Sequence, residues 1–512
     1  MLRLSGIALR EGRCPPQGPA VHKEKRNQYS MDQFMNILTV IDNHIWGIPL
    51  CVLIIGCGIW LTLRVRLLQL RHLGRALKYM VQNESGGEGE VTSFGALCTA
   101  LSATIGTGNI VGVATAIAAG GPGALFWMEL AAFFGMATKY SEGLLAIKYR
   151  TVDKNGHALG GPFYYIERGM GKNWKWLAKT FAFLGATAGL LGIGTITQVN
   201  GITSAAQNFF DPEMRHVVFT IGQGDSAAAI TVTTIVAGVL VTLAAALVII
   251  GGIKRIASVS QIIVPFMAIS YVAFALILLF CNLSALPGAV VTVITSAFAP
   301  QAALGGVIGA TIKDAIQNGV ARGIFSNEAG LGSAPIAAAA AQTKEPVRQG
   351  LVTMTGTFID TIIVCTMTGL SIVLTESWLP ELGLQGVEIT SRAFQVGLPF
   401  PTQVSAFVLM MCLIFFAFTT ILGWDYYGER CLEYFTGGSK IAVKCYRWLY
   451  IAAVFVGPYL TVVAVWTIAD IFNALMAIPN IIALLALSGV VARETREYFL
   501  KDRQRQLYRQ RH

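Results

Sequence analysis

Long apolar runs separated by short polar segments dominate the chain. The runs fall at about 47–63, 94–119, 124–147, 178–206, 230–252, 260–282, 301–341, 351–375, 403–424, 448–469 and 471–491. A helix needs about 20 apolar residues to cross the hydrocarbon core of a bilayer. We therefore expect an all-α polytopic membrane protein with about eleven transmembrane helices.

The second of these runs is interrupted in its middle. It contains the sequence Gly106-Thr107-Gly108-Asn109 between apolar residues. Glycines and small polar residues at this place predict a broken helix. Unwound backbone survives at membrane depth only where protein buries it or where it lines a cavity. A broken membrane helix is therefore a candidate binding site.

The seventh run is too long for one span and carries a matching interruption. It contains Gly323-Ile324-Phe325-Ser326-Asn327-Glu328-Ala329-Gly330-Leu331-Gly332-Ser333-Ala334-Pro335. With the first span set aside, the remaining spans form two halves of about 190 residues, and each half opens with a broken segment. This arrangement predicts a 5+5 inverted-repeat transporter with its site near the bilayer midplane.

These features divide the chain into five parts. Residues 1–30 are basic and rich in proline, and we interpret them as a disordered or mis-called N-terminal extension. Residues 31–93 hold the extra N-terminal helix and a cytoplasmic loop. Residues 94–282 form the first repeat, 283–491 the second, and 492–512 a basic cytoplasmic tail.

Charge supports a membrane protein and predicts its orientation. Only 13% of the residues are charged, and the net charge is +10, whereas soluble domains are about 25% charged. Lys and Arg gather in alternate loops, and the loops between them, at 120–123, 207–229, 283–300 and 376–402, are poor in both. The positive-inside rule then puts the N-terminus outside and the C-terminus in the cytoplasm. The basic segment before Met31 is the one conflict with this orientation.

Several functional classes find no support in the sequence. The nine cysteines form no CxxC pair, and the histidines lie in tails and loops, so neither a metal site nor a disulfide framework is indicated. No nucleophile–base pair occurs in the spans, which argues against a membrane enzyme. The sequence contains no basic module with interleaved aromatic residues, so a nucleic-acid partner is not indicated.

The unwound segment at residues 106–109 suits two kinds of ligand. Free backbone amides at the start of a half-helix attract a carboxylate. Freed carbonyls and hydroxyls suit a hard cation such as sodium. Close helix packing is the alternative role for glycines in membrane helices, but it does not explain the polar residues beside them.

Further polar and aromatic side chains in the spans have two interpretations each. Gln198 either contacts substrate or bonds another helix. Phe325, directly before Ser326, either caps a small pocket or faces lipid. Thr419 and Thr420 either complete a sodium shell or bond back to their own helix.

Aromatic and acidic residues of the second repeat leave similar alternatives. Trp424 is either a pocket wall or an interfacial anchor. Glu328 is either a ligand or a partner of Arg322, because an intramembrane carboxylate needs a partner. Asp360 serves either ion coupling or a structural pair, and the role of Asp425 stays open.

Longer motifs carry a resemblance to a known family. They are Gly106-Thr107-Gly108-Asn109-Ile110, Gly120-Gly121-Pro122-Gly123-Ala124-Leu125-Phe126-Trp127-Met128, Gly135-Met136-Ala137-Thr138-Lys139-Tyr140 and the segment at 319–335. Together they resemble the alanine or glycine:cation symporters, the sodium:alanine symporter family, from about residue 31 to 497. Glu129 departs from the apolar or aromatic residue expected at its position.

The resemblance implies a leucine-transporter-like fold with one extra N-terminal helix and two discontinuous helices. It implies sodium as the coupling ion, no other cofactor, and uptake of alanine and glycine across a prokaryotic plasma (inner) membrane. The implied substrate-binding residues are Thr104, Gly106, Thr107, Gly108, Asn109, Gln198, Phe325, Ser326 and Trp424. The implied sodium ligands are Ala103, Gly106, Thr419 and Thr420.

We therefore expect a sodium-coupled symporter of small neutral amino acids that works as a monomer in the lipid bilayer. The alternative is a proton-coupled or uncoupled amino-acid permease. The preference among alanine, glycine, serine and D-isomers stays open, as does the stoichiometry.

Overall fold

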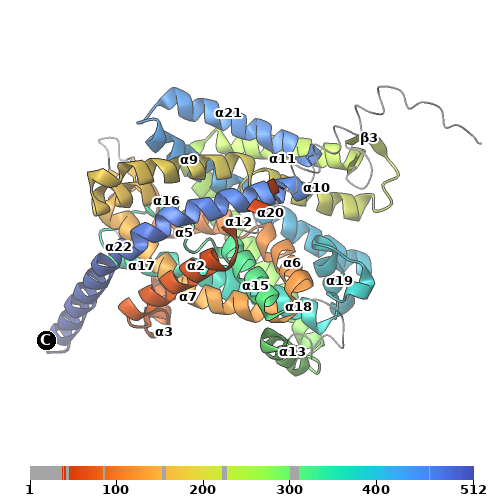
Figure 1. The fold of residues 1–512 in the computed structure, drawn as a ribbon, viewed down its shortest axis with the longest axis horizontal. Helices are drawn as coiled ribbons and strands as arrows, with labels where there is room; N and C mark the ends of the chain where they lie inside the picture. The colour runs from red at the N-terminus through yellow and green to blue at the C-terminus, as the bar shows by residue number, and fades with distance from the viewer. Residues whose placement is uncertain are drawn as a thin grey trace, which may run out of the picture.

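The structure is a computed structural model that describes residues 37–38, 40–41, 45–82, 84, 87–152, 157–221, 228–299, 311–460 and 462–511. The predicted extension at 1–30 and residues 301–310 at the start of the seventh apolar run lie outside the described residues. Helices account for most of the described chain (Figure 1).

The first half of the chain contains helices from α2 to α13. Their bounds are α2 Ile48–Arg64, α3 Leu68–Arg71, α4 Leu73–Val81, α5 Ser93–Thr104, η1 Thr107–Asn109, α6 Val111–Gly120, α7 Gly123–Tyr149, α8 Pro162–Tyr165, η2 Ile166–Met170, η3 Lys172–Trp174, α9 Lys175–Leu191, α10 Ile196–Phe210, α11 Val232–Ile249, α12 Gly252–Cys281 and α13 Leu286–Phe298. Two short antiparallel hairpins lie in the loops, β1 Thr151–Val152 with β2 Ala158–Leu159 and β3 Val217–Ile221 with β4 Ala228–Thr231.

The second half continues with helices from α15 to α22. Their bounds are α15 Ile312–Asn327, α16 Ala334–Ala338, α17 Pro346–Thr357, η5 Phe358–Cys365, α18 Thr366–Leu374, η6 Pro380–Leu382, α19 Val387–Gly397, α20 Thr402–Phe435, α21 Lys440–Val456, η7 Gly457–Tyr459 and α22 Val462–Arg511. The segment η5 is a π-helix inside an otherwise α-helical span. Such insertions occur frequently at functional sites.

The length and apolar composition of the helices fit the predicted membrane protein. Seven described helical segments are long and apolar enough to cross a bilayer, and α5, α6 and α13 are among the shorter apolar helices. The expected total of about eleven crossings stays a prediction, because each broken helix consists of pieces that are individually too short to be recognised as a crossing.

The broken helices lie inside the bundle. Helix α15 packs on α6 and α7, while α5 packs on α12 and α20. In Figure 1 these elements gather near the middle of the molecule, and α21 and α13 lie at opposite edges. Helix α2 packs on α7 and α22 and also contacts α15. Its Ile54 side chain reaches the second break, where a Cβ on Gly330 would lie 3.6 Å from Ile54 Cγ2.

Three helix boundaries differ from the sequence-based expectation. Helix α13 occupies the predicted loop at 283–300, and its apolar residues had been too few to indicate a span. The fourth run is divided into α9 and α10 by residues 192–195. Helix α22, the long blue helix running diagonally across Figure 1, continues through the predicted tail.

A short strand-like contact fastens the segment before α5 to the segment after α16. Val91 pairs in parallel with Ala341, and the Gln342 N–H donates to the Val91 carbonyl at 2.7 Å. Arg150, just after α7, donates to the carbonyls of Ala339 and Ala341, each at 2.6 Å. This contact therefore joins the chain just before α5 to the chain just after α16.

Candidate substrate and ion site

The first predicted break is present. Helix α5 ends at Thr104, Gly106 is extended (φ −142°, ψ −152°), and α6 resumes at Val111. The N–H of Gly106 donates to Asn109 Oδ1 at 2.9 Å. A Cβ at position 106 would lie 2.5 Å from Thr420 Oγ1. Glycine is needed here because another helix approaches the backbone closely.

The second predicted break is also present. Helix α15 ends at Asn327, and α16 begins at Ala334. Between them Glu328, Gly330 and Gly332 all have positive φ angles of 56°, 93° and 82°. A left-handed backbone is unusual for a glutamate, and it turns this segment out of the helix.

A third break was missed by the sequence analysis. Residues 192–195 separate α9 from α10, and the Trp424 side chain occupies the space that a Cβ on Gly194 would need. The signal was the spacing of Gly192 and Gly194 within an apolar run. Thr195 and Thr197 follow these glycines, but glycines and threonines are also ordinary helix-packing residues in membranes.

Gln198 connects the third break with the first. Its Nε2 donates to the Ile193 carbonyl at 2.9 Å, and its Oε1 accepts from the Thr107 N–H at 3.2 Å. The side chain is buried. Contact between Gln198 and the predicted substrate segment is thus observed, in the form of a hydrogen bond between helices.

Asp360 connects the first break with the second. Its Oδ1 accepts from Asn109 Nδ2 at 2.8 Å, and its Oδ2 accepts from Ser326 Oγ at 2.9 Å. Thr361 Oγ1 donates to the same Oδ2 at 2.8 Å. Asp360 lies in the π-helix η5, and these three side-chain partners are neutral. The structure therefore brings the two predicted half-sites together around one buried carboxylate.

Phe325 packs against the first break as well. A Cβ on Gly108 would lie 3.3 Å from Phe325 Cδ1 and 3.2 Å from Ser326 Cα. Phe325 is only 3% exposed, which excludes a lipid-facing role. The Arg322 guanidinium lies 5.8 Å from the centre of the Phe325 ring.

The predicted sodium ligands on α20 lie beside α5. Thr420 Oγ1 donates to the carbonyls of Ile105 at 3.3 Å and Phe416 at 3.0 Å. Thr419 Oγ1 contacts the Phe415 and Phe416 carbonyls and Met267 Sδ. Both threonines thus bond their own helix, and Thr420 also reaches the first break. Ala103 packs on Gly423, which has no side chain to separate the two helices.

Glu328 finds partners other than the expected Arg322. Its Oε1 accepts from Trp424 Nε1 at 2.8 Å, and its Oε2 accepts from Ser333 Oγ at 2.5 Å. Arg322 forms an ion pair with Asp470 at 3.0 Å. Trp424 is fully buried, so an interfacial anchor is excluded and the indole lies against the second break.

The sequence assigned no role to several other buried polar residues. Within the described residues, Glu129 Oε1 and both carboxylate oxygens of Asp425 are buried without a hydrogen-bond partner. Glu142 and Asn480 were not singled out from the sequence, yet both bond the second break at Gly330. Their signal was available, because polar groups within apolar spans are costly and usually functional.

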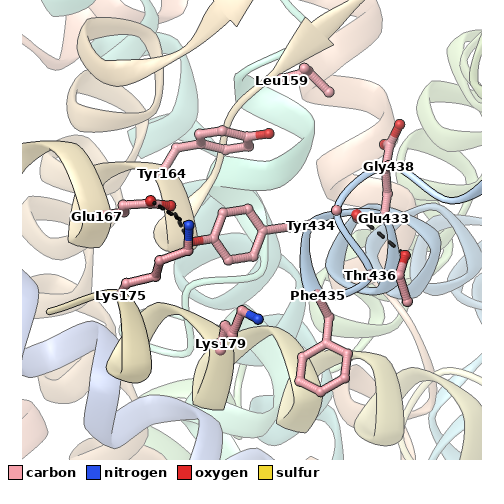
Figure 2. A pocket seen from close by; sticks show the side chains of 11 residues that line it. Leu159, Tyr164, Glu167, Lys175, Lys179, Glu433, Tyr434, Phe435, Thr436 and Gly438 are labelled. Atoms are coloured by element: carbon pink, nitrogen blue, oxygen red, sulfur yellow. Dashed lines mark hydrogen bonds and ion pairs between the residues drawn. The ribbon is translucent and has the colours of Figure 1, made fainter. Parts of the chain in front are cut away.

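A surface pocket lies near the end of α20. It has a volume of about 470 Å³, and its lining includes Tyr164, Lys179, Glu433 and Gly438. Figure 2 shows Lys175 directed at Glu167, with which it forms an ion pair at 3.2 Å. None of the lining residues belongs to the broken segments. This pocket is therefore separate from the predicted site.

Buried, interrupted helices that bond one another define a class of protein. They are typical of secondary transporters, whose sites form at discontinuous helices. The solved structure of MhsT in complex with L-phenylalanine matches this fold with a TM-score of 0.51 and 14% identity, covering 81% of this chain and 99% of that one. The fold is thus leucine-transporter-like.

The sequence profile of the sodium:alanine symporter family matches residues 31–511, and the chain belongs to that family. The sodium/alanine symporter AgcS of Methanococcus maripaludis is 45% identical, over 91% of this chain and 97% of the relative. An uncharacterized transporter of Haemophilus influenzae is 55% identical, over 91% and 96%. The family assigned from the sequence motifs is thereby confirmed.

Proposed function

We propose that the protein takes up alanine, or a similarly small neutral amino acid, by symport with sodium across the plasma membrane. One observation carries this proposal: Asp360 bonds Asn109 of the first break and Ser326 of the second. These bonds support the proposal that the two breaks form a single buried site. Kinship with a sodium/alanine symporter supports the choice of substrate and ion.

The substrate carboxylate is proposed to bind the amides of the first break. The N–H groups of Gly106 and Thr107 lie at the start of η1, where backbone dipoles favour an anion. Asn109 Oδ1 and Gln198 Oε1 accept from these groups in the structure. A carboxylate is a stronger acceptor than a neutral amide. We expect it to replace Asn109 Oδ1 at the Gly106 N–H, while the hydrogen bond from Thr107 to Gln198 holds the unwound backbone in place.

Sodium is proposed to bind between α5 and α20. Hard cations prefer oxygen ligands, and Thr420 Oγ1 lies 3.3 Å from the Ile105 carbonyl. The proposed ligands are Ala103, Gly106, Thr419 and Thr420. A cation there would hold α20 against the first break and order its amides for the substrate. Sodium and amino acid would then raise each other's affinity, as coupled ligands must.

Uptake of labelled alanine into proteoliposomes tests the proposal. An inward sodium gradient is compared with an equal potassium gradient, and protein-free liposomes provide the background. We expect accumulation only with sodium. Uptake driven by a proton gradient without sodium would make the protein a proton-coupled permease. Equilibration with no dependence on either gradient would make it an uncoupled one. Competition by unlabelled glycine, serine and D-alanine then defines the substrate range.

A further inference from the structure

The backbone of the second break has to find hydrogen-bond partners away from its own helix. Helix α15 ends at Asn327 and α16 starts at Ala334, and residues 328–333 are all buried. Buried backbone groups without partners are costly, and no lipid-exposed unwound segment survives within a membrane. The question is which side chains replace the missing helical bonds.

Two helices supply them at Gly330. Glu142 Oε1, on α7, accepts from the Gly330 N–H at 3.2 Å. Asn480 Nδ2, on α22, donates to the Gly330 carbonyl at 2.9 Å. Asn480 Nδ2 also donates to Glu142 Oε1 at 2.7 Å, and Tyr165 donates to Asn480 Oδ1. The amide and the carbonyl of one glycine are thus both bonded by side chains from elsewhere.

These contacts lie next to the proposed site but do not include its proposed ligands. On one side of Gly330, Glu328 bonds Trp424, and Ser326 bonds Asp360. Among the described residues, Glu142 and Asn480 form their side-chain hydrogen bonds with Gly330, Tyr165 and each other, and not with a proposed substrate or sodium ligand. They act on the site through the backbone of the break, in which the two glycines, Gly330 and Gly332, would be free to adopt other conformations without such bonds.

We infer that Glu142 and Asn480 are positioning residues, which hold the second break in the shape that presents Ser326 and Glu328 to the site. For its transport readout this inference rests on the proposed function. It differs from simple packing support because it predicts a local effect on residues 328–333 and on substrate affinity, and not a general loss of the fold.

The structure offers a matched pair of substitutions at Glu142. Oε1 accepts both bonds, whereas the buried Oε2 accepts none by hydrogen-bond geometry. In Glu142→Gln the amide oxygen can keep both bonds, whereas Glu142→Ala removes them. Asn480→Ala removes the remaining bond to the Gly330 carbonyl. Tyr165→Phe is a milder change, because it removes a hydrogen bond one step further away.

Hydrogen–deuterium exchange of the purified full chain gives a readout independent of transport. We expect faster exchange at residues 328–333 in Glu142→Ala and Asn480→Ala, with exchange in α11 unchanged, and near wild-type exchange in Glu142→Gln. Unchanged exchange at the break in both alanine variants would overturn the inference. So would equal acceleration along all helices, since that result indicates a general structural role.

Sodium-driven alanine uptake gives the second readout. We expect the alanine concentration at half-saturation to rise about tenfold in Glu142→Ala and Asn480→Ala, because small misplacements in a binding site are expensive. In the double variant, the half-saturating alanine concentration should rise no further than in the more severely affected single variant. Both substitutions act on the backbone of the same residue, Gly330. Folded variants with wild-type half-saturation overturn the inference while the proposed function stands. A wild-type protein without alanine uptake refutes the proposed function, and the exchange experiment still decides this inference.

Discussion

Gln198 accepts a hydrogen bond from the backbone N–H of Thr107, at 3.2 Å and across 91 residues of sequence. The bond ties α10 to the unwound centre of the first broken helix. The same side chain donates to the Ile193 carbonyl at 2.9 Å. One glutamine therefore satisfies backbone groups in two interrupted helices, and its removal should be felt at the proposed carboxylate site.

Replacement of Gln198 by alanine is expected to weaken alanine binding. A hydrogen bond near a charged ligand contributes about 1.5 kcal/mol, so half-saturation should rise about tenfold. Sodium-driven uptake over a range of alanine concentrations measures the change. The matched control is Thr203→Ala, on the same helix, because the Thr203 hydroxyl bonds only Val199 and Asn200 carbonyls of α10. Equal effects of both substitutions would contradict a specific role for Gln198.

Glycine at position 106 should be irreplaceable. A Cβ there would meet Thr420 Oγ1 at 2.5 Å and Gln198 Oε1 at 3.1 Å. We expect Gly106→Ala to abolish uptake, since both neighbours would have to move. Gly112→Ala is the control, because no contact from the described part of the chain comes within 4 Å of its Cβ position. Alanine is favoured over glycine in a helix by about 1 kcal/mol, so this variant should keep uptake and melt no lower than wild type.

Loss of the two α20 hydroxyls should weaken the dependence on sodium. In Thr419→Ala combined with Thr420→Ala, two proposed oxygen ligands are gone, and we expect sodium half-saturation to rise by about tenfold or more. Uptake at saturating alanine over a range of sodium concentrations measures it. Thr436→Ala, at the exposed end of the same helix, should leave the sodium curve unchanged. An unaltered curve in the double variant would refute the proposed sodium ligands.

A loop histidine should make stability depend on pH. His157 Nδ1 lies 3.0 Å from Glu90 Oε1, and its Nε2 lies 3.4 Å from Glu433 Oε1. Hydrogen bonds to Glu433 and Glu90 raise the pKa of His157 from 6.5 to about 9, against the opposing effects of burial and of Arg430. Arg430 contacts His157 Nε2 and forms an ion pair with Glu433 at 2.6 Å.

The sign follows from the raised pKa. The stabilisation by charged His157 is complete below about pH 6.5 and is lost as the pH rises through about 9. We expect the melting temperature of the wild type to fall towards that of His157→Gln between about pH 7 and pH 10. Detergent-solubilised protein, heated at a series of pH values, provides the measurement. A constant difference between the two proteins over this interval would show that His157 does not titrate there.

Local composition predicted much of the architecture. The two interrupted helices were visible because glycines and polar residues stood inside apolar runs. Gly106 and Ser326 were found for the same reason. The third break was not predicted, since Gly192, Gly194 and Thr195 match the small residues that pack helices together in membranes. The π-helix at Asp360 has no distinctive composition.

Long-range partners could not be predicted from the sequence. Glu142 and Gly330 are 188 residues apart, and Asn480 lies a further 150 residues along the chain. Their bond depends on how α7, α15 and α22 pack, which no local pattern specifies. The pairing of Arg322 with Asp470 instead of Glu328 has the same origin. Sequence proximity favoured Glu328, and the tertiary fold supplied another acid.

The strand-like contact between Val91 and Ala341 bears on how this molecule can move. With Arg150 bonded to the Ala339 and Ala341 carbonyls, the outer ends of α5 and α16 form one mechanical unit. We therefore expect a tilt of either half-helix to carry the other with it. The two interruptions, at 105–110 and 328–333, would then bend together.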